Sequence, residues 1–426
     1  MVNRRVVITG LGVVAPNGVG VPAFLHALQN GISGIKFIEQ HEAFKYNCQV
    51  SGMPDFDWDG LQNYLSDVTF HGLKGIGIGY AIKAALDAWT DAGNNIEQDS
   101  VNWETGCVFG NSVADSQLMK RVISMVDAQE ARKLGSRIVE QMMNSGPTAY
   151  ISGRLNLGNK VVTNSSACAT GSQSVLMGSE YIRHGYAKRM VVGSTEYIDP
   201  YIFGAFDSMR ILPRKFNDAP QKASRPMSAS AGGFVPGSGA AALVLEDLDF
   251  ALERGAKIYA EILGGANNSG GQRDGGSMTA PNPEGIIRCI EDALQISGIH
   301  ANQIDLISGH LTATGADKLE IQNWTKALQR EGEKFPLINS VKSMIGHCLS
   351  AAGSIEIVAV ILQIMHGFVH PNINLEDPNP EITKLISLDS MPVKKAEKEI
   401  DIVAKSNFGF GDVNTCLIFS KYKKNG

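Results

Sequence analysis

The sequence predicts an α/β fold built from two similar halves. Short β-rich runs alternate with stretches of helical periodicity along the 426 residues, which is typical of layered α/β proteins with largely parallel sheets. The order of these elements also restarts near Ala256, and each half then has the usual size of a domain. We therefore expect an N-terminal half over residues 1–256 and a C-terminal half over residues 257–426.

The elements of the N-terminal half follow from β-rich runs and from helical spacing. Residues 6–9 are β-branched throughout, which favours a buried strand. Residues 75–92 repeat apolar side chains at helical spacing. A turn of small residues after a strand at 160–163 leads into a helix that ends near Arg183. Further strands are expected at residues 106–110, 190–194 and 241–246.

The C-terminal half repeats this alternation. We expect a strand at 257–263, a helix at 284–296, a strand at 304–308, a long apolar helix at 347–365, and strands at 401–404 and 415–419. No low-complexity linker separates the two halves. We therefore expect them to share one continuous interface.

Composition and charge argue against several functional classes. The net charge of -5 argues against a general nucleic-acid binder, which normally has a basic excess. Residues 1–5 lead straight into the first strand without a signal region, and we expect no apolar run long enough to span a bilayer. The cysteines are scattered without a Cys-x-x-Cys pair, which is typical of reduced thiols. These features predict a cytoplasmic protein that does not enter a membrane.

Cys168 is the candidate nucleophile. It lies among small residues at 164–172, between a predicted strand and a predicted helix. A cysteine at a helix N-terminus faces unpaired N–H groups and the positive end of the helix dipole, and both favour the thiolate, which is the form that attacks acyl groups. Its own N–H could stabilise an oxyanion on the acyl group. A buried structural cysteine is the alternative, since free cysteine is among the most buried residue types.

Two histidines lie at the ends of predicted elements. His310 follows a strand, and His347 begins the long apolar helix. Neutral imidazoles there could donate hydrogen bonds to a thioester carbonyl as it becomes an enolate, and a helix N-terminus helps to keep His347 neutral. Lys342 and Glu356 could form a supporting ion pair, although a solvated pair is the alternative. We expect no zinc site, because the two histidines lie far apart in the sequence without further ligands nearby.

A glycine pattern near the N-terminus suggests a nucleotide site. Residues 6–15 match Gly-x-Gly-x-x-Ala after a strand, the pattern of a dinucleotide-binding turn. However, Pro16, Asn17 and Gly18 interrupt the chain before the next helix. Pyrophosphate binding requires the glycine turn to open directly onto a helix N-terminus. We therefore expect no nicotinamide cofactor.

Several motifs in the same order resemble the β-ketoacyl-acyl-carrier-protein synthases of the elongating type (synthase I/II), in the thiolase-like superfamily. The resemblance covers nearly the whole chain. Its motifs are the opening strand at 4–12, the nucleophile elbow at 166–170, the mid-chain loop at 224–226 with 233–235, the histidine motifs at 310–314 and 342–347, and the gating loop at 407–411.

The resemblance implies a five-layered αβαβα fold of two pseudo-symmetric α/β halves. It implies a decarboxylative Claisen condensation, in which an acyl thioester on Cys168 is joined to malonyl-acyl-carrier protein during fatty-acid or polyketide/polyene chain elongation. His310 and His347 would stabilise the enolate that forms on decarboxylation. Lys342, helped by Glu356, would organise the two histidines.

The same resemblance implies the partners. The N–H groups of Cys168 and Phe410 would form the oxyanion hole, and Phe410 would gate the acyl pocket. No metal or redox cofactor is expected, since the phosphopantetheine arm arrives on the acyl carrier protein. Arg210, Arg214 and Lys215 form a basic cluster that could dock this acidic partner, with solvated surface charge as the alternative. We expect a homodimer, with a heterodimer as the alternative.

The sequence also departs from the family pattern. Leu311 stands where the family usually has glycine, the stretch between Thr314 and Asp317 is one residue shorter, and Asp412-Val413 replaces Gly-Thr. The mid-chain loop has uncharged residues in place of acidic and basic ones: Ser228, Ala231, Gly232 and Ser238. These departures leave every catalytic side chain in place. Several of them lie near the entrance and the gate, so we expect them to affect substrate choice.

Two other functions share this fold. A thiolase would carry a second catalytic cysteine in a Cys-x-Gly motif, but Cys416 is followed by Leu417 and Ile418. The catalytically reduced chain-length partner subunit of a heterodimeric synthase would lack the nucleophile. Cys168 therefore argues against the partner subunit, which remains the alternative.

Overall fold

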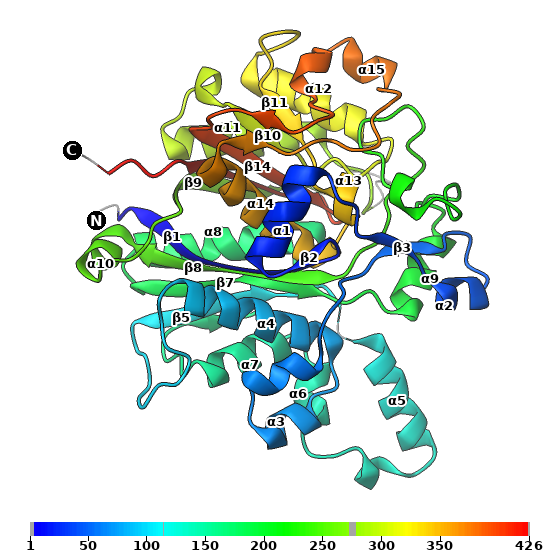
Figure 1. Ribbon diagram of the computed structural model, residues 1–426, viewed down its shortest axis with the longest axis vertical. Helices are drawn as coiled ribbons and strands as arrows, with labels where there is room; N and C mark the ends of the chain where they lie inside the picture. The colour runs from blue at the N-terminus through cyan, green and yellow to red at the C-terminus, as the bar shows by residue number, and fades with distance from the viewer. Residues whose placement is uncertain (1–3, 114, 272–277, 425–426) are drawn as a thin grey trace.

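The computed structural model describes residues 4–113, 115–271 and 278–424, and its main feature is one large mixed sheet (Figure 1). The strands of this sheet, in chain order, are β1 (Val6–Ala15), β2 (Gly18–Val19), β5 (Thr105–Gly110), β6 (Val161–Val162), β7 (Arg189–Glu196), β8 (Gly239–Asp247), β9 (Ala260–Ser269), β10 (Leu306–Ser308), β11 (Leu337–Asn339), β14 (Ile402–Gly409) and β15 (Val413–Ser420).

The strand order shows two equivalent half-sheets. The order β6-β5-β7-β8-β1 of the first half is repeated as β11-β10-β14-β15-β9 in the second. Only β5 and β10 pair in parallel with their neighbours, and the other pairs are antiparallel. The expectation of largely parallel sheets was therefore wrong. Strands joined by a tight turn, such as β14 and β15, must run antiparallel.

The two half-sheets meet at one short pairing and enclose a central helical layer. Residues 6–8 of β1 pair with residues 260–262 of β9. The helices α8 (Thr170–Arg183) and α14 (Ala352–His366) lie between the half-sheets (Figure 1). The outer face of the first half-sheet is covered by α4 (Ile76–Asp91) and α7 (Gly146–Arg154). The outer face of the second is covered by α11 (Pro283–Ser297) and α12 (Asp317–Leu328). The predicted five-layered, pseudo-symmetric fold is confirmed. Its boundary between residues 256 and 257 stays a prediction.

The central helices approach each other closely. A Cβ atom on Gly171 of α8 would lie 2.4 Å from the backbone nitrogen of Ser354, and one on Gly353 of α14 would lie 2.4 Å from that of Ser172. Only glycine permits these contacts between the helix backbones. The segment Leu349–His366 is apolar and long enough to span a bilayer, contrary to our expectation, but 89% of it is buried inside the protein. It is the core helix of this fold.

The glycine pattern at residues 6–15 belongs to a strand. β1 continues to Ala15, so Gly10 and Gly12 lie within it. A Cβ atom at these positions would lie 2.1 Å from the carbonyl oxygen of Ala88 and 1.9 Å from that of Ala84. The two glycines therefore let α4 pack on β1, which explains the pattern without a nucleotide.

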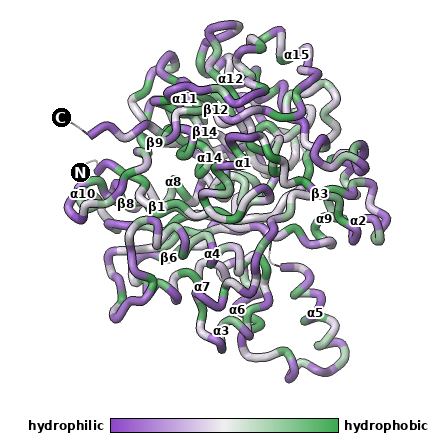
Figure 2. Tube along the Cα trace, in the orientation of Figure 1, coloured by the Kyte–Doolittle hydropathy of each residue, from purple (hydrophilic) through white to green (hydrophobic). Residues whose placement is uncertain are grey.

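The remaining elements are short or lie at the periphery. Hydrophilic stretches lie mostly in the outer loops and at the chain ends (Figure 2). The short or peripheral elements are β3 (Ile35–Phe37), β4 (Val50–Gly52), β12 (Phe368–Val369), β13 (Ala396–Glu397), α1 (Val21–Asn30), α2 (Glu39–Ala43), α3 (Asp67–Gly72), α5 (Ser116–Asp127), α6 (Ile138–Met142), α9 (Pro200–Ser208), α10 (Leu248–Glu253), α13 (Lys342–Ile345) and α15 (Pro380–Thr383).

Candidate active site

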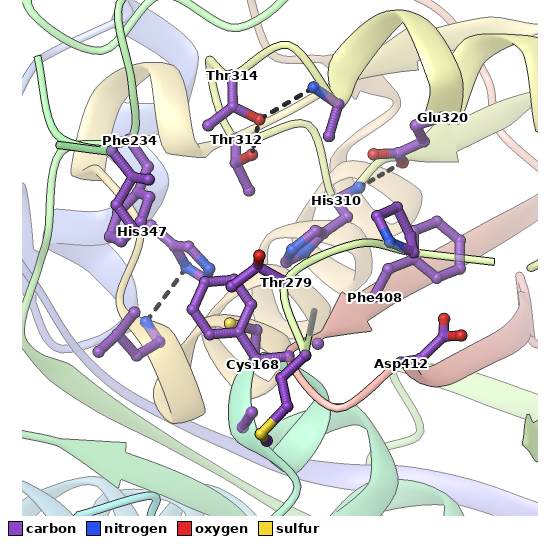
Figure 3. A pocket seen from close by; sticks show the side chains of 18 of the residues that line it. Cys168, Phe234, Thr279, His310, Thr312, Thr314, Glu320, His347, Phe408 and Asp412 are labelled. Atoms are coloured by element: carbon purple, nitrogen blue, oxygen red, sulfur yellow. Dashed lines mark hydrogen bonds between the residues drawn. The ribbon is translucent and has the colours of Figure 1, made fainter. Parts of the chain in front are cut away.

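Cys168 lies in a sharp turn that leads into the central helix α8. The turn is a 3-10 helix at Ala167–Ala169, and Ala167 has a φ of 46°. This left-handed conformation is strained for a residue with a Cβ atom. Thr170 holds the turn, because its hydroxyl oxygen accepts from the N–H of Ser166 at 2.7 Å and donates to the carbonyl of Ala167 at 2.7 Å. The cysteine side chain lines a cavity of about 490 Å³ (Figure 3).

Both predicted histidines line the same cavity from the C-terminal half. His310 follows β10, and His347 follows α13. The Cys168 sulfur and one ring nitrogen of each histidine all lie within 4.8 Å of one another. The two imidazole rings stand edge to face, with centroids 5.2 Å apart and planes at 82°. Residues distant in the sequence are thus brought to one point.

One local expectation about His347 was wrong. The long helix α14 begins only at Ala352, after a 3-10 turn at Leu349–Ala351. His347 therefore does not lie at the N-terminus of α14, and its neutrality has another cause. Burial lowers the pKa of His347 to about 3, and the charge of Lys342 adds to this. Burial and Lys342 also hold the pKa of His310 well below its usual value.

Hydrogen bonds to Nδ1 define the tautomer of both rings. The N–H of Leu349 donates to Nδ1 of His347 at 3.2 Å, and Nδ2 of Asn407 donates to Nδ1 of His310 at 3.3 Å. When Nδ1 accepts, the proton of a neutral imidazole lies on Nε2. Nε2 of His347 has no hydrogen-bond partner among the described residues. The cavity therefore contains neutral imidazoles whose Nε2–H groups can donate to a ligand.

The convergence also bears on metal binding. We expected no zinc site because the two histidines lie far apart in the sequence. In the fold, however, Cys168, His310 and His347 could reach one cation. With Nδ1 of each ring already accepting a hydrogen bond, Nε2 carries the ring proton and would have to lose it to bind a metal. The absence of a metal stays a prediction.

A buried charge network lies behind the histidines. Glu356 on α14 forms ion pairs with Lys342 and with Lys405, the latter at 2.7 Å between Nζ and Oε2, and Asn407 donates to it at 2.9 Å. All three charged side chains are at most 1% exposed. Burial alone would raise the pKa of Glu356, but the two lysines lower it to about 2. The predicted Lys342–Glu356 pair is therefore formed, and it is buried.

Three members of this site were missed in the sequence. Lys405 was the most visible of them, since it is a charged residue inside a strand that is otherwise buried. Glu320 accepts hydrogen bonds from the backbone N–H groups of His310 and Leu311, each at 2.7 Å. Asp317 accepts one from the backbone N–H of Thr312. Their spacing, one helical turn apart just after the histidine loop, was the available signal.

The electrostatics of Cys168 contradict the expected thiolate. Burial raises the pKa of the thiol to about 11, although Lys342 and the N–H of Phe410 act in the opposite direction. A helix terminus contributes up to about 2 kcal/mol, whereas full burial can shift a pKa by about 3–5 units, or roughly 4–7 kcal/mol. Cys168 is therefore mainly a thiol at neutral pH.

Phe410 lies beside the thiol, in the turn between β14 and β15. The predicted gating loop at 407–411 is strand as far as Gly409, so only the residues from Phe410 onward form the turn. The backbone N–H of Phe410 faces the thiol closely enough to lower its pKa, against the larger effect of burial. Phe410 also lines the cavity, as does Phe234, whose ring packs edge to face on His347 at 5.4 Å between centroids. The two aromatic residues therefore contribute apolar walls to the cavity beside Cys168 and His347.

The predicted docking cluster lies at the surface near the cavity. Arg210, Arg214 and Lys215 are all exposed. Ile211, which follows Arg210 directly, lines the cavity. The cluster is therefore accessible close to the site, although no contact of these residues tests a docking role.

Two family descriptions match the chain. Residues 3–251 match "Beta-ketoacyl synthase, N-terminal domain" and residues 259–376 match "Beta-ketoacyl synthase, C-terminal domain". The chain belongs to the β-ketoacyl synthase family. The predicted resemblance and the prediction of an acyltransferase that forms carbon–carbon bonds are thereby confirmed.

Relatives of this synthase match it along their whole length. The 3-oxoacyl-[acyl-carrier-protein] synthase 2 of Coxiella burnetii is 33% identical over 426 residues, covering 99% of both chains. A type II polyketide ketosynthase, solved with its acyl-carrier protein and bound to a hexaketide, is 28% identical with a TM-score of 0.85, covering 99% of this chain and 100% of that chain. The ishigamide ketosynthase/chain length factor is 29% identical with a TM-score of 0.88 and the same coverage.

Proposed function

We propose that this synthase joins an acyl group held on Cys168 to a malonyl unit delivered by an acyl carrier protein. One observation carries the proposal. The Cys168 sulfur lies within 4.8 Å of a ring nitrogen of each of His310 and His347, in one cavity. A nucleophile and two neutral hydrogen-bond donors at this spacing suit covalent acyl transfer followed by enolate formation.

The first step transfers the acyl group to Cys168, and the proton of the Cys168 thiol ends on the carrier. The sulfur of Cys168 attacks the thioester carbonyl, and the N–H groups of Cys168 and Phe410 stabilise the oxyanion. The carbon–sulfur bond to the carrier then breaks, and the carrier thiolate takes the proton that Cys168 lost. Because Nε2 of each histidine already carries a proton, neither ring can accept the thiol proton there, and the proton passes from the Cys168 thiol to the leaving sulfur of the carrier.

The second step forms the new carbon–carbon bond. The carboxylate of the malonyl thioester leaves as carbon dioxide, and its bonding electrons form an enolate that accepts hydrogen bonds from His310 and His347. The enolate carbon attacks the acyl carbonyl on Cys168. The carbon–sulfur bond to Cys168 breaks, the cysteine thiolate takes a proton from water, and a 3-oxoacyl group leaves on the carrier.

An acylation experiment tests this function. We expect purified protein mixed with acyl-acyl-carrier-protein thioesters of graded length to gain the mass of one acyl group. Peptide mapping should place it on Cys168, and the Cys168→Ala variant should gain none, since none of the other described cysteines lines the cavity. Intact-mass spectrometry measures both. A wild-type protein that stays unmodified with every chain length would instead favour the chain-length partner subunit.

We also propose that the cluster Arg210, Arg214 and Lys215 docks the carrier protein. Complementary charge at an interface rim mainly increases the association rate. Arg214→Glu should therefore raise KM for an acyl-carrier-protein substrate by about tenfold at low salt, through lost attraction. It should leave acylation by a small N-acetylcysteamine thioester unchanged. Equal effects on both substrates, measured by steady-state kinetics, would show that the charge does not act on docking.

A homodimer remains our proposal for the assembly. β6 is the terminal strand of the large sheet, and its Val161 is 45% exposed. An open sheet edge with an exposed apolar residue favours pairing with another chain. One solved neighbour contains a chain length factor, which keeps a heterodimer as the alternative. The mass of the purified chain in solution distinguishes the two, since a monomer would indicate a missing second subunit. The cytoplasmic location also stays a prediction.

A further inference from the structure

Lys405 is a charged side chain inside a strand of the large sheet. It lies in β14, where Lys405 and Asn407 are two residues apart and therefore point to the same face of the sheet. The side chain of Lys405 reaches Glu356 on the central helix α14 and is 0% exposed. A lysine is almost never fully buried unless it is paired. Its place behind the catalytic cavity therefore calls for a physical account.

Two lysines bind separate oxygens of one carboxylate. Nζ of Lys405 lies 2.7 Å from Oε2 of Glu356, and Nζ of Lys342 binds Oε1. Lys405 also donates to the carbonyl of Ser406. Both partners of Lys405 are acceptors, which suits a protonated lysine, because an ammonium group can only donate. Two positive charges thus share one negative charge, and the three side chains together carry one positive charge in excess.

The other titratable groups beside Lys405 offset this excess only in part. Glu320 on α12 acts on Lys405 as a negative charge. Burial, however, raises the pKa of Glu320 to about 7, so only part of the population is ionised at neutral pH. Burial also raises the pKa of the Cys416 thiol on β15 to about 12, and this thiol is therefore neutral. The two neighbouring imidazoles are neutral as well.

The excess charge acts on the reacting groups. The charge of Lys342 lowers the pKa of the Cys168 thiol and of both imidazole rings. The charge of Glu356 acts on Cys168 in the opposite direction. Lys405 acts on the two rings in the same direction as Lys342. Seen from the cavity, Glu356 thus works against Lys342, and Lys405 works against Glu356.

We propose that Lys405 is a positioning residue, which neutralises Glu356 and so keeps the positive charge of Lys342 available to the cavity. The described partners of the Lys405 ammonium are Glu356 and Ser406, so it acts through the carboxylate. For catalysis the inference rests on the proposed function, because the second step places the negative charge of an enolate beside the histidines. A fixed positive charge stabilises such an anion far more in a buried site than in water.

Two rates measured at pH 7 test the proposal on the full chain. Alkylation of Cys168 by iodoacetamide, located by peptide mapping, follows the thiolate fraction. Release of labelled carbon dioxide from malonyl-acyl-carrier protein follows enolate formation. Lys405→Met removes the charge and keeps an extended side chain, and each rate should fall by about tenfold or more, the equivalent of about one pKa unit in the thiol. Lys384→Met, which removes a lysine from an exposed ion pair, should change neither rate.

A second substitution separates charge from packing. Lys405→Met leaves Lys342 and Glu356 as a pair without excess charge. Adding Glu356→Gln restores one positive charge in excess, although it perturbs the packing further. We therefore expect the double variant to recover both rates to within about threefold of wild type, because the charge felt in the cavity is restored. A structural role for Lys405 predicts the opposite, since damage to the packing accumulates.

The outcomes separate this inference from the function on which it rests. Unchanged rates in Lys405→Met would overturn the inference, as would a folded double variant that reacts more slowly than the single one. If the double variant does not fold, as judged by its melting temperature, Lys405→Arg decides: it keeps the charge and should retain both rates, and an equal loss in the methionine and arginine variants would overturn the inference. A wild-type protein that releases no carbon dioxide would overturn the proposed function, whereas the alkylation rates would still report on Lys405.

Discussion

Substitution of His347 by alanine should lower malonyl decarboxylation by about 10²–10³-fold, the effect of removing one preorganised donor to a developing oxyanion. Acylation of Cys168 should remain within about tenfold of wild type. The two steps separate because the oxyanion of the first step faces backbone N–H groups, whereas the enolate of the second faces the imidazoles. Burial, which lowers the pKa of His347 to about 3, keeps the ring neutral at every pH used for such assays.

The measurement follows both steps in one sample. Release of labelled carbon dioxide from malonyl-acyl-carrier protein reports decarboxylation, and intact mass reports the acyl adduct. His26→Ala, an exposed histidine on α1, serves as the control and should change neither rate. Normal decarboxylation by the His347 variant would show that the ring does not stabilise the enolate. Loss of acylation alone would show that His347 acts as the base for the thiol.

Both halves of the molecule have the same kind of turn before their central helix. The central helix α8 is preceded by a 3-10 turn whose first residue, Ala167, has a positive φ, and α14 is preceded by a 3-10 turn whose first residue, Leu349, has one too. Cys168 and Ser350 are the second residues of these turns. The fold thus repeats one geometry, and the N-terminal copy places a cysteine in the cavity, whereas the hydroxyl of Ser350 is bound inside the protein by Thr195 and Glu196.

Residues with local signatures were predictable from the sequence. Cys168 was identified by small neighbours between a strand and a helix, and the structure places it in such a turn. The helices α4 and α11 each begin and end within one residue of the predicted bounds, because their apolar spacing is long and regular. Local pattern was sufficient wherever the structure is decided by neighbours in the chain.

Properties that depend on packing between distant segments were not predictable. The thiolate expected for Cys168 followed from its place beside a helix, but the surrounding cavity raises its pKa to about 11 through burial. Lys405 came to the site because β14 lies beside α14, a contact that no local pattern encodes. The break between His347 and α14 has the same origin, since the N–H of His347 donates to the carbonyl of Val235 at 2.7 Å, from the other half.

Glu356→Gln should destabilise the fold by about 3–5 kcal/mol, the cost of removing one partner from a buried ion pair. The variant keeps the shape of the side chain but leaves Lys342 and Lys405 without a counter-ion in a site where each is at most 1% exposed. Urea unfolding at neutral pH measures the difference. Glu284→Gln, whose ion pair with Arg288 on α11 is exposed, should cost less than about 0.5 kcal/mol.

The pH dependence of this loss identifies its cause. In wild type the pKa of Glu356 lies at about 2, below its ordinary value of 4.5, so its contribution is complete above pH 4.5 and is lost as the pH falls towards 2. In the variant, Lys405 keeps the burial that lowers its pKa and loses the opposing charge of Glu356, so the unfolded chain binds more protons than the folded one. Stability of the variant should therefore rise with pH. A destabilisation that stays constant between pH 6 and 10 would indicate altered packing and not unpaired charge.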